Sequence, residues 1–272
     1  MEFVATQEKC VFVIGSCVSV DSVSSVFSIG SCVSNEEKNE EKEEVIPKLD
    51  IDPSRKWIID QRYVGERNTR NPYFTGPTYE SNWLIRKTPG SKYGSFAVGS
   101  YPDKPTYFEN LKQAGLETFV CLNSEYGLWS KGQYFQKYGD SLPKDRFIHE
   151  RIDDMGIVND AIIIHLAEEI VRRIKNGENV YLHCAGGHGR TGTVAIVVLN
   201  MLYPDLNYIE LFEYVQYSHD QRGGNYFGNG KFVYKMPDDH LAYKFVEGQV
   251  PSPQTIAQRT QVRRIIRTPP IL

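Results

Sequence analysis

One stretch decides the fold of this chain: Val180-Tyr181-Leu182-His183-Cys184-Ala185-Gly186-Gly187-His188-Gly189-Arg190-Thr191-Gly192-Thr193. Its first three residues are an apolar run typical of a β-strand, and a glycine-rich turn follows Cys184. The apolar run at 194–199 then predicts a buried helix. A strand, a glycine turn and a helix N-terminus in this order present backbone N–H groups and the positive end of a helix dipole. The stretch therefore predicts an anion-binding loop.

The loop also contains the residues for nucleophilic attack on a phosphoryl group. A thiol attacks as the thiolate, which is a minor species for a free cysteine of pKa about 8.5. The helix dipole, the N–H groups and Arg190 would stabilise the thiolate of Cys184. The planar guanidinium of Arg190 can hold two phosphoryl oxygens, and Thr191 would hydrogen-bond the leaving sulfur. The predicted phosphate-binding residues are Cys184, Ala185, Gly186, Gly187, His188, Gly189 and Arg190, with His183 in a supporting position.

A leaving alkoxide or phenoxide needs a proton, which a carboxyl group at the same sheet edge would supply. Asp154, which follows a predicted strand, is the first candidate and Asp153 the second. The alternative for either is a helix-capping or salt-bridged carboxylate. Gln254 and Gln258 open the predicted last helix and would position the attacking water, although glutamines at a helix start are commonly surface residues.

Strands and helices alternate from residue 95 onward. The patterns predict strands at 95–99, 117–122, 146–149 and 180–182, helices at 107–114, 159–174, 191–202 and 207–217, and the end of a further helix at 135–138. Such alternation predicts an α/β fold with a central, mainly parallel sheet flanked by helices on both faces. We expect Ile162, Ile163, Leu166, Ile170 and Ile174 to share a buried helix face capped by Asn159, and Ile256, Val262 and Ile266 to face inward on the last helix.

The domain organisation follows from composition. Residues 1–50 predict a low-complexity, disordered N-terminal tail with an acidic linker. Residues 51–272 predict one domain, with an irregular N-terminal wrap at 51–94, a catalytic core at 95–217, an insertion at 218–249 and a C-terminal helix at 253–267.

The charge and cysteine content exclude several classes of protein. The net charge of −3 over 272 residues gives no general attraction to nucleic acid or to an anionic membrane, so we expect no stable nucleic-acid binding. No continuous apolar run is long enough to span a membrane. Five cysteines without a Cys-x-x-Cys pair argue against a disulfide scaffold and a thiolate zinc site, and favour a reducing, cytoplasmic setting. Cys121 is expected in the core.

With these residues in view, the chain resembles the cysteine-based protein tyrosine phosphatases, in particular the dual-specificity members. Their His-Cys-x5-Arg-Thr pattern is met in full by residues 183–191, and Ile152-Asp153-Asp154 matches the dual-specificity acid loop. The resemblance implies a phosphocysteine intermediate on Cys184 and neither a metal nor a cofactor. Gln254-Thr255-Ile256-Ala257-Gln258 is similar to the water-positioning segment of tyrosine-specific members, whose Trp-Pro-Asp sequence is absent here.

Three functions stay open at this point. The first is a phosphatase of phosphorylated proteins, acting on tyrosine and also on serine or threonine. The second is a phosphatase of phosphoinositides, inositol phosphates or RNA 5′ ends, favoured by the basic residues between 62 and 87 and by His188 if it is protonated. His188 would otherwise be a solvent-facing loop residue. The third is an inert module that binds phosphorylated partners, a class that usually lacks the cysteine, the arginine or the acid.

Overall fold

The computed structural model describes residues 46–47, 49, 76–220, 222 and 250–267. All of them belong to the unit formed by residues 43–272. The predicted tail up to residue 45, the wrap between residues 51 and 75, and residues 221 and 223–249 of the predicted insertion lie outside the described residues. The basic residues Arg62, Arg67 and Arg70 also lie outside them.

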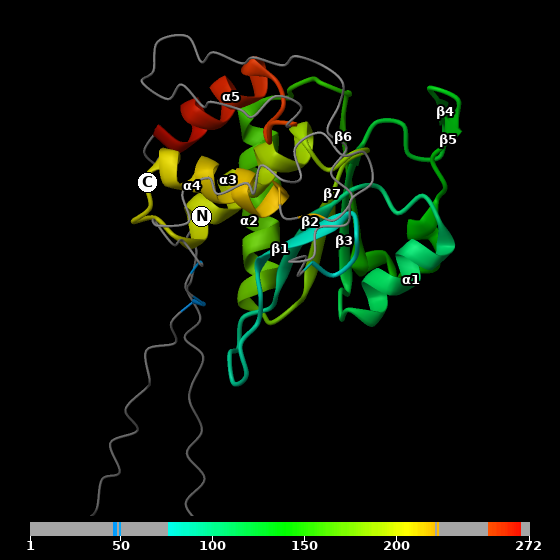
Figure 1. Ribbon diagram of the computed structural model, residues 1–272, viewed down its shortest axis with the longest axis horizontal. Helices are drawn as coiled ribbons and strands as arrows, with labels where there is room; N and C mark the ends of the chain where they lie inside the picture. The colour runs from blue at the N-terminus through cyan, green and yellow to red at the C-terminus, as the bar shows by residue number, and fades with distance from the viewer. Residues whose placement is uncertain (1–45, 48, 50–75, 221, 223–249, 268–272) are drawn as a thin grey trace, which may run out of the picture. The chain divides into compact units, whose positions relative to one another are not determined.

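Five strands form a mixed sheet in the order β1-β2-β7-β3-β6 (Figure 1). They are β1 (Ser81–Ile85), β2 (Phe96–Gly99), β3 (Thr118–Asn123), β6 (Phe147–Ile152) and β7 (Val180–His183). The four strands from β2 to β6 in this order are parallel, and β1 runs antiparallel to β2 at one edge. Cys121 of β3 lies opposite His183 of β7, so the carboxyl ends of these strands meet at one edge, where ligands of parallel sheets bind.

Helices cover both faces of the sheet. The helix α1 (Pro105–Gln113) packs on one face, where Phe108 and Leu111 join Phe119 and Tyr181 of the strands. The other face carries α2 (Asp160–Lys175), α3 (Gly189–Leu202), α4 (Tyr208–Asp220) and α5 (Ile256–Arg267) (Figure 1). Neighbouring strand residues such as Tyr181 and Leu182 alternate between the two cores. The predicted α/β class with helices on both faces is confirmed.

The central helix α3 explains the apolar run after the loop. Every residue from Val194 to Leu199 is at most 1% exposed, because α2, α4 and α5 surround a helix that already lies on the sheet. A helix that is apolar on all sides is expected in such a position. The core also receives Ile46 and Leu49, and Tyr203 donates a hydrogen bond to the carbonyl oxygen of Pro47. The chain therefore packs on the domain from residue 46, inside the predicted tail.

The connection between β3 and β6 differs from the prediction. It contains a small hairpin of β4 (Trp129–Ser130) and β5 (Gln133–Tyr134), then the 3-10 turns η3 (Tyr138–Ser141) and η4 (Lys144–Arg146). The helix end predicted at 135–138 is therefore wrong. Phe135 and Tyr138 are buried in an aromatic cluster around Tyr101, and their spacing of three imitates one face of a helix.

The other predicted elements are confirmed, with ends shifted by a few residues. The side chain of Asn159 caps α2 by accepting from the N–H of Ala161. Two predicted inward residues are wrong, since Ile162 is 38% exposed and Ile256 is 45% exposed. The buried stripe of α5 instead contains Gln258, Arg259 and Gln261 beside Val262, and polar members of a buried stripe escape a hydrophobic pattern. β1 was not predicted and lies within the supposed wrap.

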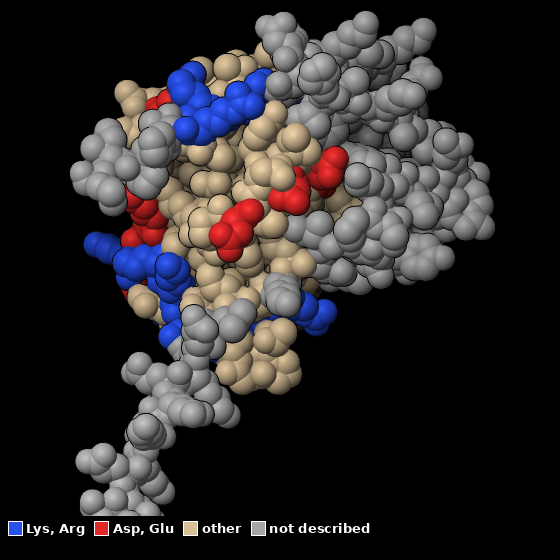
Figure 2. All heavy atoms as spheres, turned by 90° about the vertical axis from the view of Figure 1, so that its left-hand side faces the viewer, with Lys and Arg blue, Asp and Glu red and all other residues tan. Residues whose placement is uncertain are grey.

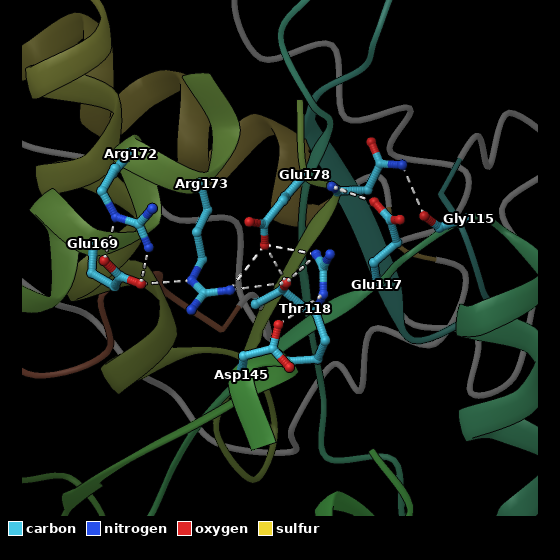
Figure 3. A network of polar contacts seen from close by, with 10 residues as sticks. Gly115, Glu117, Thr118, Asp145, Glu169, Arg172, Arg173 and Glu178 are labelled. Atoms are coloured by element: carbon cyan, nitrogen blue, oxygen red, sulfur yellow. Dashed lines mark hydrogen bonds and ion pairs between the residues drawn. The ribbon is translucent and has the colours of Figure 1, made fainter. Parts of the chain in front are cut away.

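A polar network closes the sheet edge opposite the predicted loop (Figure 3). Arg173 of α2 lies between Glu169 and Glu178, at 2.7 and 2.9 Å. Glu178 also accepts from Arg146 at 2.8 Å and from the Thr118 hydroxyl at 2.8 Å. This network ties α2 to the start of β3, to the approach to β7 and to η4. Within the described part of the chain, no helix has the length and hydropathy needed to span a membrane.

Candidate active site

The predicted phosphate loop runs from the end of β7 into α3. Cys184 follows β7 directly and is 3% exposed, and α3 begins at Gly189. Gly187 has φ of +72°, and a Cβ atom there would lie 2.2 Å from the carbonyl oxygen of Gly99. A side chain at this position would therefore force the loop away from β2.

Three carbonyl groups of the loop have protein partners. The Tyr101 N–H donates to the oxygen of Ala185 at 2.9 Å, Arg222 donates to that of Gly186 at 3.3 Å, and the Ser252 hydroxyl donates to that of His188 at 3.0 Å. Within the described part of the chain, the backbone N–H groups of residues 185–188 have no acceptor. The loop thus uses its acceptors for its own support and leaves its donors for an anion.

His183 supports Cys184 through its backbone. Its Nδ1 lies 3.2 Å from the carbonyl oxygen of Cys184, and its Nε2 lies 2.5 Å from the hydroxyl of Tyr138. Because a carbonyl can only accept, Nδ1 carries the proton and Nε2 accepts from Tyr138. Burial lowers the pKa of His183 to about 3, so the ring is neutral. Tyr138 was missed by sequence reasoning because it lies in an irregular connection.

Arg190, the second residue of α3, is 2% exposed and connects three segments. Its Nη1 donates to the carbonyl oxygen of Ile152 at 2.9 Å and to Glu125 at 3.2 Å, and its Nη2 donates to Asp154 at 3.1 Å. Burial acts to lower the pKa of Arg190, but the negative charges of Cys184, Glu125 and Asp154 outweigh it and raise the pKa. The structure therefore brings Cys184, Arg190 and Asp154 together as predicted, and adds Glu125.

Asp154 is held by two cations. One carboxylate oxygen accepts from Arg190, and the other accepts from Lys131 on the β4–β5 hairpin. Burial acts to raise the pKa of Asp154, but the hydrogen bond from Lys131 and the charges of Arg190 and Lys131 lower it overall. Asp153 is exposed, and the contact it makes with its loop is through its carbonyl oxygen, which accepts from the N–H of Gly156. The geometry favours Asp154 over Asp153.

Thr191 and Asn123 have buried polar groups without partners in the described part of the chain. The hydroxyl of Thr191, which is 1% exposed, and both side-chain polar atoms of Asn123 make no hydrogen bond. Thr191 lies in the first turn of α3, and Asn123 ends β3 at the same edge of the sheet. A buried hydroxyl without a partner costs about 1–3 kcal/mol, which a ligand or a thiolate would recover.

Gln258 lies beside the loop but its amide is already engaged. The oxygen accepts from the N–H groups of Gln254 and Thr255, and the nitrogen donates to the carbonyl oxygen of Gly156 at 3.0 Å. A Cβ atom on Gly189 would lie 2.6 Å from the oxygen of Gln258. Gln258 therefore joins the acid loop to the phosphate loop, while Gln254 is half-buried at the start of α5.

His188 is half-buried and packs against α4. Its Nδ1 lies 2.6 Å from Nε2 of His219, and the ring lies over Gly186. Burial and then the charge of Arg222 lower the pKa of His188 to about 3. The ring is neutral at physiological pH, so it adds no positive charge toward a second phosphate. Sequence reasoning could not find this pair because His219 is 31 residues away.

Cys121 is fully buried on β3, as predicted, and burial raises the pKa of its thiol to about 12. It is therefore a core thiol at neutral pH. This contrast leaves Cys184, at the mouth of the loop, as the cysteine placed for chemistry among the described residues.

The chain was compared with known protein families, sequences and structures. Residues 91–205 match the family model described as "Swiss Army Knife protein, DSP-PTPase phosphatase domain". The search of curated protein sequences found no match.

The solved structures to which the chain is similar include three phosphatases. It is 18% identical to Tk-PTP in its active form, with 67% of this chain and all of that chain covered and a TM-score of 0.44. It is 17% identical to a kinase-associated phosphatase whose catalytic cysteine is replaced by serine, with 70% and 97% covered and a TM-score of 0.45. It is 13% identical to human DUSP28, with 62% and 86% covered and a TM-score of 0.41. Residues 91–205, which contain both the acid loop and the phosphate loop, therefore match the model of a dual-specificity-type phosphatase domain.

Proposed function

We propose that this chain hydrolyses phosphomonoesters on proteins through a phosphocysteine intermediate on Cys184. The observation that carries the proposal is the convergence of Cys184, the phosphate loop, Arg190 and Asp154 at one sheet edge. This convergence supports the roles of nucleophile for Cys184, phosphate clamp for Arg190 and acid for Asp154 in an in-line phosphoryl transfer.

In the first step, the thiolate of Cys184 attacks phosphorus. A P–S bond forms while the P–O bond to the leaving group breaks, and Asp154 gives its proton to the leaving oxygen. The N–H groups of residues 185–188 and the guanidinium of Arg190 hold the three remaining phosphoryl oxygens.

In the second step, a water molecule attacks the phosphocysteine. Asp154 takes a proton from that water, a new P–O bond forms, and the P–S bond breaks to release inorganic phosphate and the thiolate. The hydroxyl of Thr191, which has no partner in the described part of the chain, stabilises the leaving sulfur by donating a hydrogen bond. Gln254 and Gln258 are the candidates to position this water. Gln258 serves only if its contact with Gly156 opens.

The salt bridge between Asp154 and Arg190 belongs to the site before substrate binds. A substrate phosphate binds Arg190 with more charge than a carboxylate and takes the place of Asp154. Once displaced, Asp154 loses a cation and faces a dianion, and both changes raise its pKa toward the protonated form that an acid needs. Substrate binding thus prepares its own proton donor.

A phosphorylated protein is favoured over a highly phosphorylated small molecule or RNA 5′ end. Those alternatives need several cations at the loop. Arg222 lies there as well as Arg190, but burial lowers the pKa of His188 to about 3, so His188 adds no further charge. The proposal includes serine or threonine beside tyrosine, and an intracellular, cytoplasmic location, because a thiolate nucleophile needs a reducing environment.

The test is phosphate release from a small aryl phosphate by the purified chain. We expect turnover in the wild type, no turnover in Cys184→Ser, and full turnover in the matched control Cys121→Ala at temperatures where it stays folded. A panel of phosphotyrosine, phosphoserine and phosphothreonine peptides, phosphoinositides and an RNA 5′-triphosphate then ranks the substrates.

Equal turnover by Cys184→Ser would contradict the mechanism. Absence of turnover combined with tight phosphopeptide binding would instead identify an inert binding module. Preference for the lipid or RNA substrates would overturn the proposed substrate class.

A further inference from the structure

Exposed apolar side chains gather on the segments that border the active site. The described residues include eight exposed large hydrophobic residues, and six of these lie on three segments: Leu128, Trp129 and Tyr134 on the β4–β5 hairpin, Met155 and Ile157 on the acid loop, and Ile256 at the start of α5. Most of the exposed large hydrophobic residues in the described part of the chain therefore lie beside the site. A clustered apolar surface marks a binding region more often than scattered single residues do.

The three segments are connected around the phosphate loop. Lys131 joins the hairpin to Asp154, and Gln258 joins α5 to Gly156 two residues further along the acid loop. Asp154 in turn reaches Arg190, and Gln258 lies against Gly189. Figure 1 shows the hairpin and α5 on opposite sides of the sheet end where β6 and β7 finish. The hairpin and α5 therefore flank the acid loop on two sides.

We propose that these six residues form an apolar rim that binds the apolar side chains on either side of the phosphorylated residue in a polypeptide substrate. The inference rests on the proposed function, because it assumes that the phosphate of the substrate lies on Arg190. It adds what that function leaves open, namely which protein segments the enzyme prefers.

A polypeptide is the occupant that suits this arrangement. When the phosphoryl group occupies the loop, its ester oxygen faces Asp154, and the chain that carries it continues in two directions. Because the hairpin contacts the acid loop through Lys131 and α5 contacts it through Gln258, a chain that extends both ways from Asp154 would meet both segments. A phosphorylated headgroup of a lipid or an inositol has no chain to reach both sides.

The charges beside the rim also disfavour an anionic surface or polyanion. The positive charge of Lys131 is paired with the carboxylate of Asp154. Asp153 adds a negative charge on the acid loop. On the far side of the domain from the hairpin, the face that Figure 2 shows carries Lys and Arg in separate groups with Asp and Glu between them.

Trp129 is the central residue of the rim. It is 75% exposed, and its ring lies 5.7 Å from that of Tyr134. A tryptophan that is exposed to this extent contributes little to the stability of the fold, and its ring offers a large, rigid contact surface to a ligand. Because Lys131 follows two residues later, a chain that binds Trp129 also lies close to the proton donor.

The test compares two phosphotyrosine peptides of equal charge, one with leucine or phenylalanine on both sides of the phosphotyrosine and one with serine and glycine. The quantity is the ratio of their kcat/KM values, with turnover of a small aryl phosphate measured in parallel. We expect the wild type to prefer the apolar peptide by about tenfold, as about 1.4 kcal/mol of apolar contact predicts. Trp129→Ser reduces the ratio to about twofold, and Ile157→Ser reduces it by a smaller amount.

The matched control is His165→Ser, which removes a ring from α2 with a side chain that is 87% exposed, and leaves the ratio unchanged. A wild-type ratio near one, with normal aryl phosphate turnover, would overturn the rim while leaving the proposed function intact. Loss of aryl phosphate turnover in the wild type would instead overturn the function. Vesicle binding by the wild type that disappears in Trp129→Ser, without any peptide preference, would assign the rim to a membrane and contradict the proposal.

Discussion

Two buried arginines hold opposite edges of the same sheet. Arg173 lies at the amino edge between Glu169 and Glu178 (Figure 3), and Arg190 lies at the carboxyl edge between Glu125 and Asp154. Both side chains are about nine-tenths buried or more. Judged by burial and ion pairs alone, each arginine would be a structural cation.

The two arginines differ in how firmly their carboxylate partners are held. At the amino edge, Glu178 is fixed by Arg173, by Arg146 and by the hydroxyl of Thr118. At the carboxyl edge, Asp154 lies on an exposed loop. Its carboxylate accepts from Arg190 and from Lys131, whose side chain is 75% exposed. The comparison teaches that a saturated network stabilises the fold, whereas an arginine with a replaceable partner can accept a ligand.

Unpaired polar groups follow the same division. The hydroxyl of Thr118 at the amino edge is bonded, while that of Thr191 at the carboxyl edge has no partner in the described residues. The backbone N–H groups of residues 185–188 add further unused donors. The polar groups at the amino edge hydrogen-bond one another and stabilise the fold, whereas those at the carboxyl edge remain available to a substrate.

Replacing Asp154 is expected to have the largest effect. Asp154→Asn keeps the shape of the side chain and removes the proton donor, so kcat on a phosphate ester with a poor leaving group falls by about 10²–10⁴-fold. The loss is smaller for a nitrophenyl ester, whose leaving group needs no proton. Steady-state kinetics on both esters measures the difference, with Asp153→Asn as the control. An equal loss in Asp153→Asn would mean that the acid has been misassigned.

Replacing Arg173 tests the other edge. Arg173→Leu leaves Glu178 with fewer partners, and breaking such a buried pair costs about 3–5 kcal/mol, a loss that Arg146 and Thr118 reduce to roughly 2–4 kcal/mol. Urea unfolding measures the free energy, and the aryl phosphate assay at a temperature where the variant is folded should show unchanged kcat/KM. If activity falls while the stability does not change, the division between the two edges is incorrect.

Replacing Lys131 is expected to have the smallest effect, seen in pH dependence. Lys131 stabilises the ionised form of Asp154, whereas catalysis needs the protonated form. Lys131→Met therefore raises the pKa of Asp154, and the loss of activity at high pH occurs at a higher pH than in the wild type. Because Lys131 is mostly exposed and solvent screens its charge, the shift is small. A pH–rate profile with a poor leaving group measures it, and a shift to lower pH would contradict the assigned role.

The sequence predicts the part of the site that is continuous in the chain. Cys184, Arg190 and Thr191 fall within one strand–turn–helix unit, so local spacing was enough to identify them. Asp154 could be predicted because it follows a strand of the same parallel sheet, and the carboxyl ends of parallel strands lie together. The α/β class followed from the same alternation.

The remaining contacts depend on long-range packing. Glu125 and Lys131 belong to an irregular connection without periodicity, and the partner of His188 lies on α4. Gln258 is buried as a polar residue, so a pattern based on apolar residues placed Ile256 inside instead. These errors share one cause: side chains with tertiary hydrogen bonds carry no local signal in the sequence.

The most direct test of the account is to trap the covalent intermediate. The chain is mixed with an aryl phosphate, quenched within the first turnover, digested and examined by mass spectrometry, with Cys184→Ser treated in parallel. The account predicts one added phosphoryl group on the wild-type peptide that contains Cys184, and none on the variant peptide or on the peptide that contains Cys121. Rapid turnover without any phosphorylated cysteine, continuing in Cys184→Ser, would contradict it.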